Sequence, residues 1–182
     1  METEYLRNEK KLTHHTLSDM RAEPPGEMND VMAGAVMNGV TLKEIHSVPD
    51  ALMDGVYAHA YAFYERGELD QAEKFFSFLC MYDSSNADYF KGLGAVSQLK
   101  KNYFKASDLY ALAFLLGDGD YHAVYLSGQC HLLAGHIVKA LQSFTLVVEN
   151  SQDETLISKA EIYLEMIKSE RGNKNAGREK EE

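Results

Sequence analysis

Residues 72–79 read AEKFFSFL, and a similar order of small and aromatic residues returns as ASDLYALA in 106–113 and as ALQSFTLV in 140–147. The alanines that open the three stretches are evenly spaced along the chain, and an aromatic residue follows each of them four positions later. Three further positions keep the same phase: a very small residue twelve positions before the alanine, an apolar residue sixteen before it, and Leu69, Tyr103 or Ile137 three before it. The chain therefore contains one unit of constant length that occurs three times in succession.

The spacing of the alanines at positions 72, 106 and 140 matches the period of about 34 residues that is typical of the tetratricopeptide repeat, a helix–turn–helix unit. In each predicted second helix, the repeating alanine and the positions three, four and seven residues later form one stripe, which is apolar apart from one serine. We expect the small residue of each first helix to face this alanine, and the aromatic residue to fill the gap towards the next unit. The small residues are Ala60, Gly94 and Gly128.

The turns inside the units predict left-handed backbone at one position each. Gly67 and Gly135 suit the end of a helix because glycine tolerates positive φ. Lys101 takes the same place in the middle unit, so we expect its turn to be less relaxed.

The sequence predicts an all-α fold: three tandem tetratricopeptide repeats with an N-terminal amphipathic helix and a C-terminal capping helix. The capping helix is expected over roughly 153–169, where Ser151 and Glu154 have capping-box spacing. Thr41 and Glu44 have the same spacing before a short helical turn. The predicted parts are a flexible tail (1–26), an N-terminal helical region (27–50), the repeat domain with its cap (51–170) and a disordered tail (171–182).

The N-terminal region carries an apolar stripe with helical spacing, formed by Met28, Val31, Met32, Ala35 and Val36. Two readings stay open for it. The stripe either caps the first repeat or mediates self-association, because methionine packs adaptably against varied surfaces.

Charge and composition exclude several classes of function. Residues 27–170 hold ten basic and twenty acidic residues, so the net charge of −10 lies in this region. An acidic surface repels phosphate backbones, and we expect no direct binding of nucleic acid; the acidity could equally serve solubility alone. The start of the chain lacks the apolar run of a signal peptide, and no apolar stretch approaches the length of a membrane span. Cys80 and Cys130 lie in apolar stretches and are expected to be reduced core residues.

No arrangement of residues predicts catalysis, a metal site or a cofactor. The seven histidines form no HxxxH or HExxH pair, and no glycine-rich stretch matches a phosphate-binding loop. We therefore expect a protein that binds other proteins and is not an enzyme.

Three tyrosines of the first repeat helix are the most informative surface residues. Tyr57, Tyr61 and Tyr64 lie at i, i+4 and i+7, next to the stripe that the helix buries. Equivalent positions of the next units hold Lys91, Ala95 and Gln98, and then Tyr125, Gln129 and Leu132. Tyrosine combines a large apolar area with a polar tip, which suits an extended peptide. The tyrosines either line pockets for such a peptide on the concave face or support the N-terminal helix.

Several stretches resemble one family. They are residues 53–64 (MDGVYAHAYAFY), 72–83 (AEKFFSFLCMYD), 88–96 (DYFKGLGAV) and 108–114 (DLYALAF), together with GVTLKEIH at 39–46 and GQCHLL at 128–133. These stretches look like the class II chaperones of type III secretion, of the SycD/LcrH and IpgC/SicA type. The resemblance covers roughly residues 27–170.

The resemblance implies a chaperone of the bacterial cytoplasm that binds two hydrophobic, pore-forming translocator proteins and keeps them from aggregating or associating before secretion. Members of this family bind an extended segment of a translocator in the concave groove. By position, the resemblance implies a peptide-binding groove formed by Tyr57, Tyr61, Tyr64, Lys91, Leu93, Gln98 and Tyr125. It also implies a homodimer when no cargo is bound, formed through the N-terminal region or the repeats. In the N-terminal region, the apolar stripe offers Met28, Val31, Met32 and Ala35 for self-association.

Two other functions stay open at this point. Members of the SicA type also assist an AraC-type transcription activator, so the chain could be a coactivator, in addition to or instead of a chaperone. It could also be a general repeat scaffold in an unrelated assembly.

Overall fold

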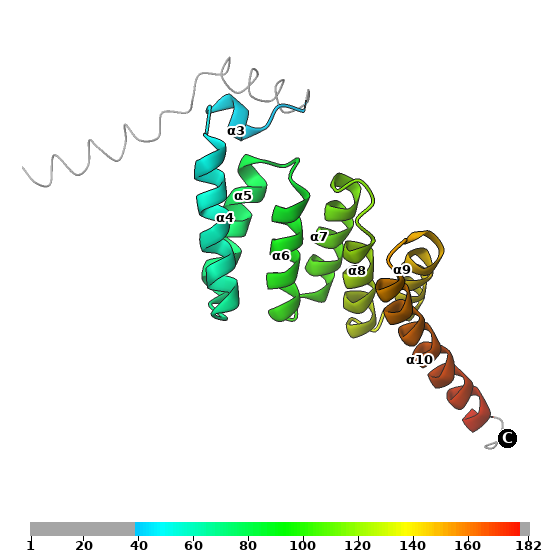
Figure 1. Ribbon diagram of the computed structural model, residues 1–182. Helices are drawn as coiled ribbons and strands as arrows, with labels where there is room; N and C mark the ends of the chain where they lie inside the picture. The colour runs from blue at the N-terminus through cyan, green and yellow to red at the C-terminus, as the bar shows by residue number, and fades with distance from the viewer. Residues whose placement is uncertain (1–38, 179–182) are drawn as a thin grey trace, which may run out of the picture. The chain divides into compact units, whose positions relative to one another are not determined.

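The computed structural model describes residues 39–178 of the chain, and side chains as far as residue 169. Within this range helices are the only regular elements. They are α3 (Leu42–Ile45), α4 (Asp50–Glu65), α5 (Leu69–Tyr82), α6 (Ala87–Leu99), α7 (Tyr103–Leu116), α8 (Tyr121–Leu133), α9 (Ile137–Asn150) and α10 (Glu154–Arg178). The long helices α4 to α9 lie side by side in chain order, and α10 follows and extends away from them (Figure 1). Each of them contacts the next, α4 also contacts α6, and α8 contacts α10.

This arrangement confirms the predicted all-α repeat architecture. The first unit is α4 with α5, the second α6 with α7, and the third α8 with α9. The same three positions of every second helix are fully buried, at 1% exposure or less: Ala72, Phe76 and Leu79 in α5, Ala106, Tyr110 and Ala113 in α7, and Ala140, Phe144 and Val147 in α9. Each helical pair thus buries one apolar stripe, and the stacked neighbours cover it.

The small residue of each first helix is predicted to face the repeating alanine; for Gly94 and Gly128 the nearest atoms belong to an aromatic ring of the second helix. A Cβ atom added to Gly94 would lie 2.9 Å from Cε1 of Tyr110, and one added to Gly128 would lie 2.9 Å from Cε1 of Phe144. The ring covers the helix where a side chain is missing, which lets the two helices of a unit approach closely. The second part of the prediction is confirmed for Phe76, whose ring packs on Gly92 of the next unit.

The turns inside the units have the predicted left-handed backbone. The φ angles are 74° at Gly67, 61° at Lys101 and 78° at Gly135. This conformation costs a residue with a Cβ atom about 1–2 kcal/mol, so the middle turn is strained at Lys101.

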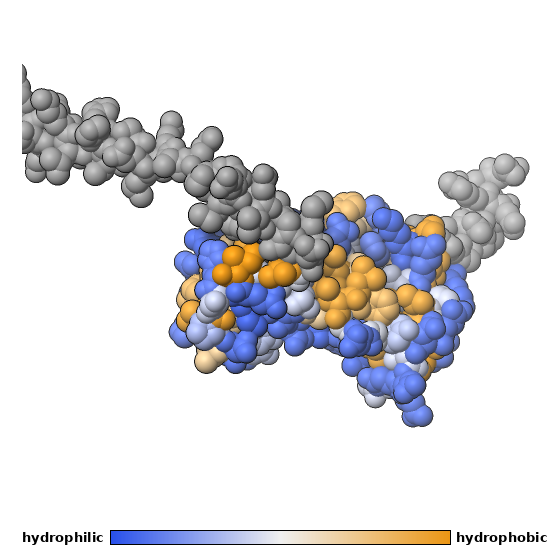
Figure 2. All heavy atoms as spheres, turned by 90° about the horizontal axis from the view of Figure 1, so that it is seen from above, coloured by the Kyte–Doolittle hydropathy of each residue, from blue (hydrophilic) through white to orange (hydrophobic). Residues whose placement is uncertain are grey.

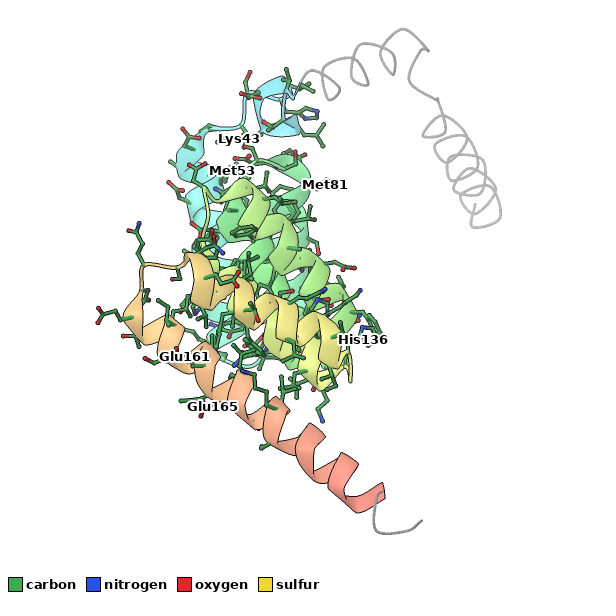
Figure 3. All side chains as sticks on the ribbon, turned by 90° about the vertical axis from the view of Figure 1, so that its right-hand side faces the viewer. Lys43, Met53, Met81, His136, Glu161 and Glu165 are labelled. Carbon is green, nitrogen blue, oxygen red and sulfur yellow. The ribbon has the colours of Figure 1, made fainter. Side chains whose placement is uncertain are left out.

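The short helix α3 is attached to the first unit by hydrogen bonds and ion pairs. The predicted capping box is confirmed: the Glu44 amide donates to Oγ1 of Thr41 at 3.3 Å, and the Thr41 amide donates to Oε2 of Glu44 at 2.8 Å. Lys43 lies beside the start of α4 (Figure 3), with Nζ 2.6 Å from Asp50 and 3.4 Å from Asp83. Burial by itself would raise the pKa of Asp83, but hydrogen bonds from Ser85 and the ion pair with Lys43 outweigh it and hold that pKa below its ordinary value.

Helix α10 differs from the predicted capping helix at both ends. Its first turn is capped by Asp153, whose Oδ1 accepts from the amides of Thr155 at 2.9 Å and Leu156 at 3.1 Å, so the predicted cap at Ser151 is wrong. The helix continues to Arg178, past the predicted end near residue 169. Leu156, Ala160 and Ile167 are buried against the third unit, whereas Glu161 and Glu165 point outward (Figure 3).

Both cysteines are free thiols, as predicted. Cys130 is fully buried, and Cys80 packs against the core of the first unit. Burial raises the pKa of each thiol to about 12.

Apolar side chains also remain on the surface, in addition to those in the core. Seen from above, they gather in patches between hydrophilic residues (Figure 2). Three of them, Phe78, Leu112 and Leu146, are separated by one repeat period each and occupy equivalent positions of the three second helices. In the part of the chain that the structure describes, no helix has both the length and the apolar character that a membrane span requires.

Candidate functional site

A hollow of about 540 Å³ lies against the first helices of the three units. Helices α4, α6 and α8 supply most of its lining, and α5 and α7 each contribute one aromatic ring. The lining residues are Tyr57, Tyr61, Tyr64, Phe76, Asp88, Lys91, Gly92, Ala95, Gln98, Leu99, Tyr110, His122 and Leu126. Aromatic rings and small residues form most of this surface, and charged groups lie mainly at one end.

The wall on α4 consists of the three tyrosines. Helix α4 buries Met53 and Ala60 in the core, and this stripe leaves Tyr57, Tyr61 and Tyr64 beside the hollow. Their rings support one another and the floor. The centroids of Tyr61 and Tyr64 are 5.9 Å apart, and Tyr57 packs edge-to-face on Phe76 at 5.9 Å. Tyr61 is 48% exposed, which makes it the most accessible tyrosine or phenylalanine ring of the site.

The floor is deep because α6 presents small residues there. Gly92 and Ala95 carry little or no side chain, so the rings of Phe76 and Tyr110 reach the hollow beside them. A Cβ atom added at Gly92 would collide with the Phe76 ring, at 2.6 Å from Cζ. The shape of the site therefore depends on this glycine.

Charged residues at one end of the hollow are paired with one another. Nζ of Lys91 lies 2.6 Å from Oδ2 of Asp120 and 3.2 Å from Oδ1 of Asp88. Asp120 also caps α8, because its Oδ1 accepts from the His122 amide at 3.0 Å. Burial alone would lower the pKa of Lys91, but the two carboxylates outweigh it and raise that pKa. Burial and the charge of Asp88 raise the pKa of Tyr57, so its hydroxyl keeps its proton near neutral pH.

The opposite side of the floor holds a neutral polar pair. The Tyr110 hydroxyl donates to Oε1 of Gln98 at 2.8 Å. Burial raises the pKa of Tyr110 well above its ordinary value, which keeps this hydroxyl a donor.

Five of the seven residues predicted for the groove line the hollow: Tyr57, Tyr61, Tyr64, Lys91 and Gln98. The structure places the other two elsewhere. Leu93 is buried in the core of the first unit, and Tyr125 packs edge-to-face on Phe144 and Tyr163 in the third. Neither Leu93 nor Tyr125 lines the hollow.

Sequence reasoning missed most of the floor and the far wall. Phe76 and Tyr110 were expected in the core, where their rings do lie, but the same rings also reach the hollow. A signal for Gly92 was present, since it follows Phe76 by sixteen residues, as Leu126 follows Tyr110 and Ala160 follows Phe144. No comparable signal marks His122, whose place depends on the loop before α8.

The predicted self-association residues Met28, Val31, Met32 and Ala35 lie outside the described residues, so that assignment stays a prediction. The reading of the tyrosines as supports for an N-terminal helix is untested for the same reason. In the described part of the chain, no group of three or more histidine, cysteine or acidic side chains is placed to hold a metal ion.

Comparisons with known proteins agree with this architecture. A tetratricopeptide repeat model matches residues 53–86 and 87–120, and the third helical pair has the same burial pattern. The chain is 52% identical over 147 residues to the chaperone protein SicA of Salmonella typhimurium, across 81% of this chain and 89% of the relative. It resembles PcrH, solved in complex with the chaperone binding region of PopD, with a TM-score of 0.63 and 28% identity over 68% of this chain and 96% of PcrH.

A type III secretion complex from Aeromonas hydrophila is similar in fold, with a TM-score of 0.72 over 79% of this chain and 98% of that chain. At 24% identity this likeness concerns the fold alone.

Proposed function

This chain belongs to the family of type III secretion translocator chaperones that includes SicA, and we propose that it holds hydrophobic translocator proteins in the bacterial cytoplasm until they are secreted. The observation that carries the proposal is the aromatic hollow between α4, α6 and α8. The related protein PcrH has been solved in complex with the chaperone binding region of PopD. We propose that an extended segment of each translocator occupies the hollow of this chain.

The physical chemistry of the hollow suits such a guest. Pore-forming proteins expose large apolar patches in water before they insert in a membrane, and those patches aggregate. Tyrosine rings take up apolar side chains of the guest and keep a polar tip at the rim, so the free site stays soluble. The net charge of −10 adds repulsion between complexes.

The same chemistry favours release without an energy source. A guest segment that is disordered when free loses conformational entropy as it binds, which reduces the affinity for a given contact area. We propose that the secretion machinery exploits this modest affinity to remove the guest. The function is binding, and none of its steps requires catalysis by the chain.

The proposed function is tested by co-expression. The chain is produced with each protein from the same organism that carries predicted membrane helices and belongs to the secretion system, and soluble complexes are isolated. We expect at least one such protein to become soluble only in the presence of this chain. If none of them does, the proposed function is wrong.

Substitutions test whether the hollow is the site. We expect Tyr61→Glu together with Tyr64→Glu to abolish the complex, because two carboxylates in an apolar site lose hydration. Ile162→Glu is the matched control, since this side chain of α10 is 65% exposed and lies outside the hollow. Circular dichroism verifies that the helices persist in every variant. A complex that survives the double substitution would remove the hollow from the proposal.

No feature of the described residues or of the relatives favours the alternative of a coactivator for an AraC-type activator, and we do not propose that role for this chain.

A further inference from the structure

We propose that Gln98 is a hydrogen-bonding anchor for the main chain of the guest, and that Tyr110 is the positioning residue that orients it. The side-chain amide of Gln98 donates to a main-chain carbonyl oxygen of an extended segment in the hollow. This inference rests on the proposed function and names the polar contact that fixes the guest in an otherwise mostly apolar site.

An extended segment that enters this hollow needs a hydrogen-bond donor. Its carbonyl groups lose water when they are buried, and an unpaired carbonyl is costly in an apolar environment. The floor beside Gln98 consists of Gly92 and Ala95, which have no polar side-chain atoms. The charged donor of the site, Lys91, is already bound to two carboxylates. The hydroxyls of the three tyrosines belong to the wall on α4, so on the floor itself Gln98 is the uncharged side chain that offers a donor.

Tyr110 determines which end of the Gln98 amide faces the hollow. Tyr110 is 1% exposed, and in the described part of the chain Gln98 Oε1 is the acceptor that its hydroxyl proton reaches, at 2.8 Å. A buried hydroxyl proton without an acceptor is costly, so the amide keeps its oxygen towards Tyr110 and its NH₂ group away from it. Among the described residues, Nε2 of Gln98 has no hydrogen-bond partner. The donor is therefore oriented and available before a guest arrives.

The ring of Tyr110 is itself held in place. It lies on Gly94 of its own unit, where an added Cβ atom would come within 2.9 Å of the ring. The Tyr110 hydroxyl is therefore held in one position, and the packing of the core fixes the orientation of the Gln98 amide. Such preorganisation reduces the entropy that binding costs.

The third unit provides a matched contrast. There Nε2 of Gln129 donates to the hydroxyls of Tyr125 at 3.2 Å and Tyr163 at 3.0 Å. This cluster also joins a glutamine amide to tyrosine hydroxyls, but here the amide donates and the hydroxyls accept. It lies outside the hollow, and its amide donor is already used. Substitutions at Tyr163 thus control for the general loss of a tyrosine–glutamine hydrogen bond.

The experiment measures the affinity of a guest peptide for the full chain by isothermal titration calorimetry. The probe is the tightest-binding peptide from an overlapping set that covers the translocator found by co-expression. We expect Gln98→Met, which keeps the size of the side chain, to weaken binding about threefold to tenfold. Tyr110→Phe should weaken it by a similar factor in the wild-type chain and should have no further effect in the Gln98→Met chain. Tyr163→Phe should leave the affinity unchanged.

A second probe identifies the acceptor. Amide-to-ester replacement, one position at a time, weakens individual carbonyl acceptors of the peptide. One ester should weaken binding to the wild-type chain and should not weaken binding to Gln98→Met further. Wild-type affinity of Gln98→Met, or equal losses from Tyr110→Phe in both backgrounds, would overturn the inference. If Tyr61→Glu together with Tyr64→Glu still abolishes binding in that case, the proposed function stands, which separates the two failures.

Discussion

The replacement of Gly92 by alanine should destabilise the protein, although alanine is the better helix former. In a helix interior, glycine to alanine is favourable by about 1 kcal/mol. At Gly92 the new Cβ atom would fall 2.6 Å from Cζ and 2.7 Å from Cδ1 of Phe76, and Phe76 is 1% exposed, so its ring has little room to move. Overpacking of this kind typically costs about 1–3 kcal/mol. The difference of these two effects is a net loss of up to about 2 kcal/mol in the free energy of unfolding.

Gly55 provides the matched control, because Gly55 and Gly92 are each the sixth residue of their helices, α4 and α6. A Cβ atom at Gly55 meets no atom within 4 Å, so Gly55→Ala should gain up to about 1 kcal/mol. Urea unfolding followed by circular dichroism gives both free energies by linear extrapolation. In thermal unfolding the two variants should move the melting temperature in opposite directions, by about 2–4 °C per kcal/mol. If Gly92→Ala gains as much stability as Gly55→Ala, the Phe76 contact does not constrain this position and the proposed cause of the deep floor is wrong.

Buried polar groups and thiols give three further predictions. Ser97 is 1% exposed, and its hydroxyl has no hydrogen-bond partner among the described residues. Ser97→Ala should therefore raise the free energy of unfolding by up to about 1 kcal/mol. A lower free energy of unfolding in urea titrations would show that the hydroxyl does have a hydrogen-bond partner. The pKa of the Asp83 carboxyl is lower in the folded protein than in the unfolded chain. The carboxylate therefore contributes its full stabilisation above roughly pH 4, and this stabilisation is lost as the pH falls through the pKa of the folded state. Asp83→Asn should therefore lower the urea midpoint at pH 7 and flatten its decline below pH 4, and an unchanged decline would contradict the combined contribution of the Ser85 hydrogen bonds and the Lys43 ion pair. Burial raises the thiol pKa of Cys80 and Cys130 to about 12, so neither should react with Ellman's reagent at pH 8 until the chain unfolds, and fast reaction in the folded state would refute this.

The fold could be predicted because the repeat specifies burial at the same positions three times. Ala72, Ala106 and Ala140 are in phase in the sequence and are all fully buried in the structure. Left-handed backbone at Lys101 could likewise be predicted from its alignment with Gly67 and Gly135. Residues one period apart occupy equivalent places in neighbouring units, so they meet equivalent surroundings. A pattern that recurs at this spacing therefore predicts the same burial or backbone conformation in each unit.

The hollow could be predicted only in part. The tyrosines of α4 follow from helical spacing next to a buried stripe, but the floor depends on which residues of other helices meet there. The pairing of Lys91 with Asp120 joins residues of different units through the geometry of the α7–α8 loop, which the period does not determine. Tyr125 shares its phase with Tyr57, yet contacts with Tyr163 of α10 and Phe144 of α9 bury it. The last repeat therefore differs from the first although their sequences are in phase, because its neighbour is a single helix and not another pair.

The residue sixteen positions after each buried aromatic ring affects the shape of the inner surface, whereas the alanine and the aromatic ring themselves hold the helices together. This residue is glycine after Phe76, leucine after Tyr110 and alanine after Phe144, and each of the three packs against the preceding ring or belongs to its apolar cluster. The stacking of helices thus tolerates three side chains of different size at one position of the period. In this chain the side chain at that one position changes from unit to unit, while the alanine and the aromatic ring that build the scaffold occur in all three units.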